Sequence, residues 1–237
     1  MESKLSIAVI ADIIASKKIE NRAPLQEILN EILKTVNTNF NDQIESYLTI
    51  TLGDEFQGII KDFKTTFLII DLIDTQLKTL TKSILKEEVT LRWGIGVGEL
   101  VTPIKDKTIS IGSDGPVYWN ARNAIEKVHS HNDHGNTTEK LVSETLEDDF
   151  FNSIIRIQNV IKNQWTTTQQ DTVSILLKEF GYEEVNNQKL KILLNQKLNK
   201  DYSEQTISKR VISTHIKQYV QSRIQLAERL EDWRKLK

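Results

Sequence analysis

Residues 5–14 read LSIAVIADII, a nearly continuous apolar run that is rich in β-branched residues. Such a run is typical of a central strand that is covered on both faces of a sheet. Only Asp12 interrupts it with a charge, close to its end. The stretch therefore predicts a buried strand at the start of an α/β fold, with one carboxylate near the C-terminal end of that strand.

Helix and strand patterns alternate through the next 130 residues. Apolar side chains recur at helical spacing in some segments and at strand spacing in others, and the Gly53-Asp54 pair between two strand patterns indicates a hairpin. The predicted helices span residues 25–36, 65–80 and 116–128, and the predicted strands span residues 47–52, 56–60, 91–100, 108–111 and 140–143. This order favours an α/β (α+β) domain with a ferredoxin-like core and appended elements.

Beyond residue 146 the strand patterns stop. Helical patterns cover residues 150–162, 168–180 and 187–198, and a last helix is expected to run from Ser203 towards the end of the chain. Thr168 is predicted to cap the second of these helices and Gly181 to end it. We therefore expect two domains: residues 1–145, which are α/β, and residues 146–237, which are all-α.

The composition excludes several classes of protein. There is no cysteine among the 237 residues, so disulfides and thiolate zinc sites are impossible, and this fits a reducing compartment. No apolar run approaches the roughly 18 residues of a membrane span, and the start lacks the features of a signal peptide. We expect a cytoplasmic protein with no membrane partner. Residues 166–237 hold 13 Lys and Arg against 9 Asp and Glu, which weakly favours a polyanionic partner for this part.

Two carboxylates could hold a metal ion. Asp12 ends the first strand and Asp54 lies in the hairpin turn, so pairing of that strand with the hairpin would point both into one cleft. Hard cations such as Mg²⁺ or Mn²⁺ take oxygen ligands and leave positions for phosphate oxygens, and the carbonyl of Ile13 could add a ligand. The alternative is that both aspartates serve only the turns in which they lie.

Four blocks carry a resemblance to a known family: ADIIASKK at 11–18, TLGDEFQG at 51–58, RWGIGVGE at 92–99 and DGPVYWNARNAI at 114–125. In this order they resemble the SatD family and, more distantly, class III nucleotide cyclases and palm domains. The resemblance covers about residues 5–130. It implies a palm-like, nucleotide-cyclase-like fold in which Asp12 and Asp54 correspond to the two metal-binding aspartates, with an ATP- or GTP-class nucleotide as ligand.

The same resemblance suggests phosphate-binding residues. Ser16, Lys17, Lys18 and Arg22 follow the first strand, where a triphosphate would lie in a palm-like fold, and a solvated basic loop is the alternative. Arg92 and Arg122 are further candidates for nucleotide binding, although each could instead pair with an acidic neighbour. Trp119 and Asn123 occupy the positions where cyclases carry an Asn and an Arg that steady the transition state. Nucleotide binding is therefore favoured over cyclisation, and no catalytic residue is assigned.

The C-terminal part has the outline of a helix-turn-helix motif. The helix after Ser203 would enter the major groove of double-stranded DNA, since short polar side chains can approach bases and cations can contact phosphates. The DNA-binding candidates are Gln205, Thr206, Ser208, Lys209, Arg210 and Lys217, whereas Ile207, Val211 and Ile212 are expected to face the core. The alternative is a helical appendage that docks on the first domain or forms a dimer. Apolar residues at 216, 220, 224, 227 and 230 fit a seam between two copies, so a homodimer is expected.

Three functions remain open on these grounds. The favoured one is a metal-dependent nucleotide-binding regulator with a DNA-binding C-terminal domain. The second is an active nucleotidyl cyclase or polymerase-like enzyme that uses two metal ions. The third is a catalytically inactive palm that acts as a dimerisation scaffold.

Overall fold

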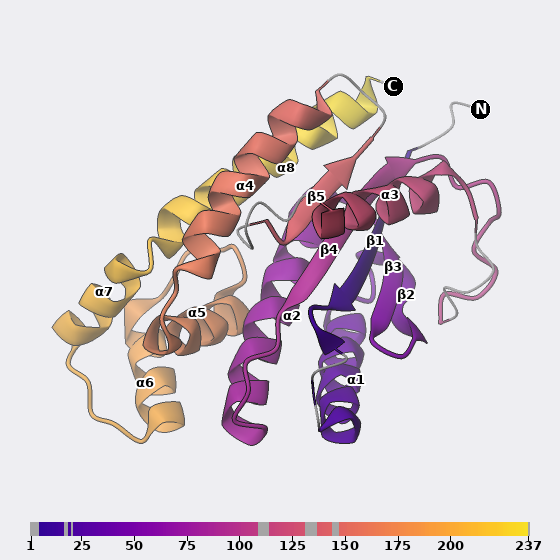
Figure 1. Ribbon diagram of the computed structural model, residues 1–237. Coiled ribbons are helices and arrows are strands. Elements are labelled where there is room, and N and C mark those ends of the chain that lie inside the picture. The colour runs from indigo at the N-terminus through magenta and orange to yellow at the C-terminus, as the bar shows by residue number, and fades with distance from the viewer. Residues whose placement is uncertain are drawn as a thin grey trace.

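A computed structural model describes residues 5–16, 19, 21–108, 114–130, 137–143 and 147–236. The chain forms a mixed α/β fold (Figure 1). In chain order its elements are β1 (Ser6–Ile13), α1 (Arg22–Asn39), β2 (Ile44–Leu52), β3 (Glu55–Ile60), α2 (Phe63–Ile84), β4 (Leu91–Gly98), α3 (Pro116–Ser130), β5 (Glu139–Val142), α4 (Asp148–Asn163), α5 (Thr167–Phe180), α6 (Asn187–Leu198), α7 (Glu204–Ser213) and α8 (Ile216–Lys235).

The five strands form one sheet in the order β2-β3-β1-β4-β5. β1 lies in the middle and runs antiparallel to both neighbours, whereas β5 joins the edge parallel to β4. The central place explains why residues 5–14 are so apolar, because a middle strand is covered on both faces. The register places Asp12 opposite Glu55 of β3 and opposite Arg92 of β4.

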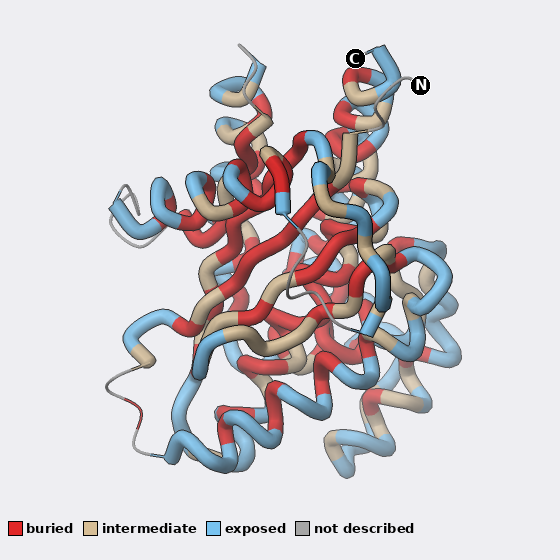
Figure 2. Tube along the Cα trace, turned by 90° about the vertical axis from the view of Figure 1, so that its right-hand side faces the viewer, coloured by how far each residue is buried: buried red, intermediate tan, exposed pale blue. Residues whose placement is uncertain are grey.

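The two faces of the sheet belong to different cores. Alternate residues of β1, such as Val9 and Ala11, face the large core that is shared with α1, α2 and the C-terminal helices. Ala8 and Ile10 face a smaller core under α3. Figure 2 shows the buried residues concentrated along the strands, as expected of a sheet with helices on both sides. Asp12 follows the alternation of Ala8 and Ile10, so it lies on the same face as α3.

α3 approaches β4 closely because β4 carries glycines on that face. A Cβ atom at Gly96 would lie 2.2 Å from the nitrogen of Ala121 and 2.2 Å from the carbonyl oxygen of Val117. These are backbone atoms that cannot move aside without displacing the helix. The alternation of glycine and apolar residues in 91–98 is therefore what seats α3 on the sheet.

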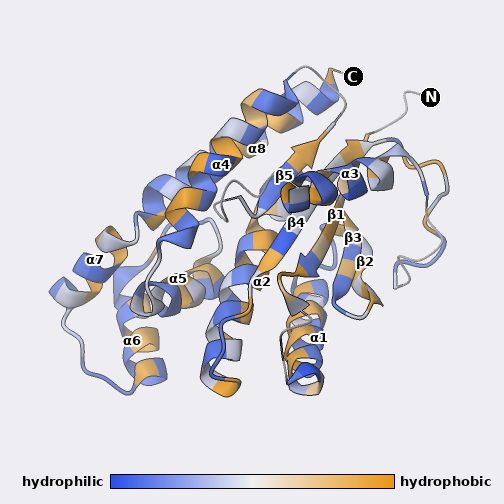
Figure 3. Cartoon of the chain, viewed as in Figure 1, coloured by the Kyte–Doolittle hydropathy of each residue, from blue (hydrophilic) through white to orange (hydrophobic). Residues whose placement is uncertain are grey.

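The C-terminal helices pack onto the sheet layer rather than standing apart from it. α5 and α8 contact α2, α4 contacts β5 and α8, and α6 and α7 pack against α5 and against each other. Figure 3 shows hydrophobic residues along the strands and alternating with hydrophilic ones along α4 and α8. One continuous core joins residues of the sheet with residues of the C-terminal helices. The boundary at 145/146 stays a prediction, and a separate all-α helix-turn-helix domain is not confirmed.

Most predicted elements are confirmed, and two details of the C-terminal part are wrong. The N-cap of α5 is Thr166 rather than Thr168, and its backbone N–H donates to Oε1 of Gln169 at 2.9 Å. The predicted last helix is two helices, α7 and α8, separated at His215, whose φ of 53° is left-handed. Gly181 does end α5, with a φ of 57°. The strand predicted at 108–111 falls mostly outside the described residues.

Among the described helices, none combines the length and the apolar character that a bilayer span requires.

Candidate functional site

Asp12 lies at one end of the sheet and is paired with an arginine. Nε of Arg92 donates to Oδ1 of Asp12 at 2.8 Å, and Nη2 donates to Oδ2 at 3.1 Å. Both side chains are partly accessible, with exposed fractions of 27% for Asp12 and 17% for Arg92. The antiparallel register produces this pair, because the two residues are directly opposite on neighbouring strands.

A second ion pair lies beside the first. Arg122 of α3 reaches the sheet and binds Glu55 with two hydrogen bonds, Nη1 to Oε2 at 2.5 Å and Nη2 to Oε1 at 2.7 Å. The hydrogen bond to Glu55 raises the pKa of Arg122 above its ordinary value. Sequence reasoning did not include Glu55. The strand alternation that places it opposite Asp12 is the signal that would have found it.

The carboxylates at this end of the sheet affect one another. Burial raises the pKa of Asp12 above its ordinary value, and although Arg92 opposes the shift, the charges of Asp54 and Glu55 add to it. Ionised Asp12 is therefore repelled by two neighbouring carboxylates. A divalent cation that takes carboxylate oxygens as ligands would relieve this repulsion.

A cavity of about 190 Å³ opens beside the hairpin turn. Its lining includes Ile13, Ser16, Arg22 and Asp54, which come from the end of β1, the loop that follows it, the start of α1 and the hairpin. Two hydrogen bonds hold these segments together: Arg22 donates to the carbonyl oxygen of Ser16 at 3.4 Å, and Gln26 donates to that of Gly53 at 3.2 Å. Residues far apart in the sequence thus meet around one cavity that polar and apolar side chains line together.

The structure brings the predicted metal and nucleotide residues together only in part. Ile13, Ser16, Arg22 and Asp54 line the cavity, but Asp12 does not, because its side chain lies on the face of α3. Within the described ranges, no group of three or more His, Cys, Asp or Glu side chains is placed to hold a metal ion. Arg92 and Arg122 are both paired with carboxylates, as the alternative held. Lys17 and Lys18 lie outside the described residues. Metal and nucleotide binding by these residues stay predictions.

The DNA-binding candidates lie on α7 and at the start of α8. Five of these candidates are exposed, as DNA binding would require: Gln205, Thr206, Ser208, Lys209 and Lys217. Ile207 and Val211, which were expected to face the core, are buried. Ile212 is 66% exposed, so its expected place in the core is wrong.

Arg210 is engaged within the chain. Its Nε donates to Oγ1 of Thr172 at 3.1 Å, its Nη2 donates to the carbonyl oxygen of Thr168 at 3.0 Å, and its guanidinium stacks on the ring of Tyr202. This arginine therefore fixes α7 to α5, and a phosphate contact would require these bonds to break. DNA binding stays a prediction.

The apolar row on α8 is used mainly inside the chain. Ile216, Ala227 and Leu230 are buried in the large core, and α8 packs against α2 and α4. The row is therefore not a free seam for a second copy, and the homodimer stays a prediction without that support.

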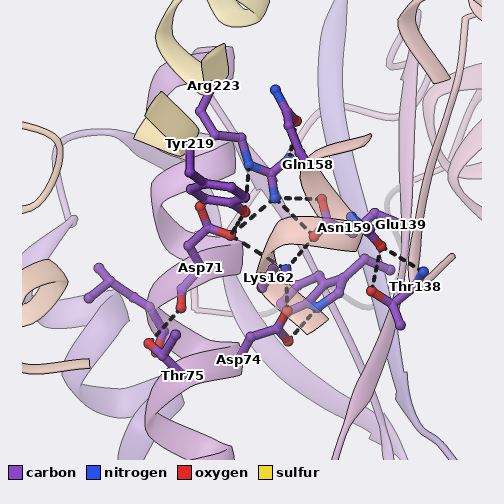
Figure 4. A network of polar contacts seen from close by, with 12 residues as sticks. Asp71, Asp74, Thr75, Thr138, Glu139, Gln158, Asn159, Lys162, Tyr219 and Arg223 are labelled. Atoms are coloured by element: carbon purple, nitrogen blue, oxygen red, sulfur yellow. Dashed lines mark hydrogen bonds and ion pairs between the residues drawn. The ribbon is translucent and has the colours of Figure 1, made fainter. Parts of the chain in front are cut away.

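Sequence reasoning missed a buried ionic network between the sheet and the C-terminal helices (Figure 4). Nη2 of Arg223 on α8 donates to Oδ1 of Asp71 at 3.0 Å and to Oε2 of Glu139 at 2.7 Å. Nζ of Lys162 on α4 donates to Oδ2 of Asp74 at 2.6 Å and also binds Glu139 and Asp71. All five side chains are at most 4% exposed. The network joins α2, β5, α4 and α8.

Neutral groups complete the network. Two tyrosine hydroxyls donate to Asp71, from Tyr219 at 2.7 Å and from Tyr182 at 2.5 Å, and Nε1 of Trp93 donates to Asp74 at 2.8 Å. Burial alone would raise the pKa of Asp71 and of Glu139, but the charges of Arg223 and Lys162 hold both below their ordinary values. This arrangement links α2, β5, α4 and α8, and removing one partner of such a network leaves a buried charge without compensation.

The fold and this geometry define a mixed α/β protein with a five-stranded sheet, an acidic sheet end beside a polar cavity, and a C-terminal helical layer fixed to the sheet. The model of the SatD family matches residues 6–230, and the chain belongs to the SatD family. The match extends through the C-terminal helices, well beyond the blocks at 11–125 that suggested it.

Solved structures of nucleotide cyclase domains are similar to part of the chain. The monomeric guanylyl cyclase domain of the RhoGC fusion protein from the aquatic fungus Blastocladiella emersonii is 14% identical, with a TM-score of 0.37 over 52% of this chain and 75% of that one. A bacterial light-regulated adenylyl cyclase is 13% identical, with a TM-score of 0.37 over 54% and 71%. The guanylyl cyclase Cya2 is 12% identical, with a TM-score of 0.36 over 50% and 68%. At these values no functional statement follows. No curated protein matches the chain in sequence.

Proposed function

We propose that the protein binds a nucleoside phosphate together with a divalent cation at the end of β1, and that it acts as a nucleotide-responsive regulator. The observation that carries the proposal is the cavity lined by Ile13, Ser16, Arg22 and Asp54. A guanidinium and a hydroxyl are suitable donors for phosphate oxygens, and the carboxylate beside them suits a metal that bridges to the phosphate.

Asp54 suits a cation that arrives with its nucleotide. Mg²⁺ usually keeps several waters and takes one or two protein carboxylates plus phosphate oxygens, so a complete cage of protein ligands is not required. Asp54 lines the cavity, and Asp12 is close enough to be affected by its charge. A bound cation would offset the repulsion among these carboxylates, and nucleotide and metal are therefore expected to bind with mutual dependence.

Calorimetry tests the proposal. ATP and GTP are titrated into the full chain in Mn²⁺, using wild type, Asp54→Asn, Arg22→Gln and, as a matched control, Arg229→Gln, which changes an exposed arginine on α8. We expect at least tenfold weaker binding in the first two variants and unchanged binding in the control. Absence of binding by the wild-type protein, or equal affinities in all four, would contradict the proposal.

Incubation of nucleotide with the protein separates a regulator from an enzyme. We expect the nucleotide to be recovered intact, because Arg92 and Arg122, the candidates nearest the acidic end, are already paired with carboxylates. A cyclic or polymeric product that Asp12→Asn abolishes would instead favour the cyclase or polymerase-like alternative.

DNA binding by α7 is the least supported part of the regulator. The exposed row of Gln205, Thr206, Ser208 and Lys209 favours it, whereas Arg210 is engaged with α5. Gel retardation of random duplexes at low salt, with Lys209→Ala beside wild type, tests it, since contacts to phosphates weaken steeply as salt rises. If the wild-type protein does not retard DNA, or if Lys209→Ala retards it equally, α7 does not bind DNA and the C-terminal helices have a structural role.

A further inference from the structure

A second polar cavity lies between α2, α5 and the end of α6. Its volume is about 300 Å³, at the lower end of the roughly 300–1,000 Å³ that is usual for small-molecule sites. It shares no lining residue with the cavity beside the hairpin turn. The proposed nucleotide site therefore does not account for it.

Lys78 of α2 is the unusual residue of this cavity. It is only 7% exposed, yet its ammonium has no hydrogen bond or ion pair with any residue in the described part of the chain. Asp74, one turn away, is the first of the charges that favour its ionised form, but that carboxylate is already bonded to Lys162 and Trp93. Burial lowers the pKa of Lys78. Nζ of Lys78 is not among the fully buried polar atoms without a partner, so it is accessible from the cavity, where an anionic ligand would pair with it.

Two further polar atoms of the lining lack partners. Gln170 is 5% exposed, and its Oε1 has no hydrogen-bond partner in the described residues; the same holds for the buried Oγ1 of Thr79. A buried polar atom that bonds to nothing is uncommon, and both of these atoms belong to residues that line the cavity. Thr167, the first residue of α5, also lines the space, so the positive end of a 14-residue helix faces it.

The rim carries both signs of charge. Lys82 and Lys197 add two ammonium groups, and Glu88 and Asp171 add two carboxylates. Lys82 donates to the hydroxyl of Thr167 at 2.6 Å and lies 3.5 Å from Glu88. Burial raises the pKa of Asp171. With three lysines and two carboxylates, the lining suits an anion that also carries hydrogen-bond donors.

We propose that this cavity binds a small phosphorylated metabolite, with its phosphoryl group at Lys78, Lys82 and Lys197 and its hydroxyl or N–H donors towards Gln170. The phosphoryl oxygens accept from the ammonium groups. The ligand would touch α2 of the sheet layer and α5 and α6 of the C-terminal layer at once. The site is independent of the proposed nucleotide function.

Calorimetry with inorganic phosphate and pyrophosphate tests the site. The titrations use the full chain in an Arg22→Gln background without metal, so that the cavity beside the hairpin turn does not contribute. Lys78→Met is compared with Lys127→Met, which changes an exposed lysine on α3. We expect pyrophosphate to bind, Lys78→Met to weaken it at least tenfold, and Lys127→Met to leave it unchanged. No binding in the background protein, or equal affinity in both variants, would overturn the proposal.

Thermal unfolding gives a second readout that a purely structural role would not produce. Without ligand, Lys78→Met and Gln170→Leu are expected to raise Tm by about 2–4 °C, because each replaces an unpartnered buried polar group with an apolar one. Pyrophosphate is then expected to stabilise the background protein more than either variant. A lower Tm in both variants, with equal stabilisation by pyrophosphate, would show that these residues only support the fold.

Discussion

Arg223→Met removes the guanidinium that the described part of the chain contributes to the buried ionic network, and it keeps an apolar side chain about as long as the aliphatic stem of arginine. The variant loses the bonds of Arg223 to Asp71, Glu139, Tyr219 and Gln158. Lys162 then remains as the one directly bonded cation for three buried carboxylates. Breaking one side of a buried ion pair costs about 3–5 kcal/mol, because a charge is left buried without compensation.

Urea unfolding measures this loss. If the dependence of the unfolding free energy on urea is about 3 kcal/mol per molar, the midpoint should fall by about 1–1.7 M at pH 7. Arg229→Met, six residues further along α8 and exposed, is the matched control and should change the free energy of unfolding by no more than about 0.5 kcal/mol.

The free energy of unfolding of wild type and of Arg223→Met should also depend differently on pH. The folded pKa values of Asp71 and Glu139 are lowered, so their contribution to wild-type stability is present above their ordinary values of 3.8 and 4.5 and is lost as the pH falls through the folded values. In Arg223→Met both pKa values should rise, and protonation should then relieve the uncompensated charge. The gap between wild type and variant is therefore expected to narrow from pH 7 to pH 4. A deficit below 1 kcal/mol at pH 7, or one that does not change with pH, would refute this account of the network.

Three other substitutions test the fold and the site. Gly96→Ala should destabilise the protein by about 3 kcal/mol or more in chemical denaturation, because its Cβ would lie 2.2 Å from backbone atoms of Val117 and Ala121; a neutral effect would mean that α3 shifts easily. Gly181→Ala should cost about 1–3 kcal/mol, since a φ of 57° with a ψ of −128° is disfavoured for any residue with a Cβ atom, and an unchanged stability would disagree. Asp12→Asn should change the free energy of unfolding at pH 7 by less than about 1 kcal/mol, because the raised pKa of Asp12 indicates that burial and repulsion offset its ion pair; a loss above 2 kcal/mol would make that pair structural.

The elements of the fold were predictable because local patterns decide them. The apolar, β-branched run at 5–14 favoured a buried strand, and α6 was predicted with the bounds that the structure shows. The α5 cap was misplaced by two residues because WTTTQQ offers three threonines, and the choice of Thr166 depends on Gln169 three residues later. The break at His215 was missed because a left-handed residue other than glycine leaves little trace in the sequence.

The partners of charged residues were not predictable, because they depend on register and on contacts between distant segments. Arg92 was suspected of pairing with a carboxylate, but only the antiparallel register identifies Asp12. Asp71 and Asp74 look like polar positions of a helix surface, yet both are buried under α4 and α8. Lys162 lies 88 residues after Asp74, to which it is bonded, and Arg223 lies 152 residues after Asp71. A single sequence does not show which of its many charges meet.

Synthesis from the first residue delivers Asp71, Asp74 and Glu139 well before Arg223. Until the final helix has been made, water must solvate these carboxylates, because burying them without Arg223 would cost several kcal/mol of desolvation free energy for each ion. We therefore expect the inner side of the sheet to remain hydrated during most of translation and to close only when the last turns of the chain dock. A nascent chain halted before that point should be open to proteases and a substrate for chaperones, however well its first strands have paired.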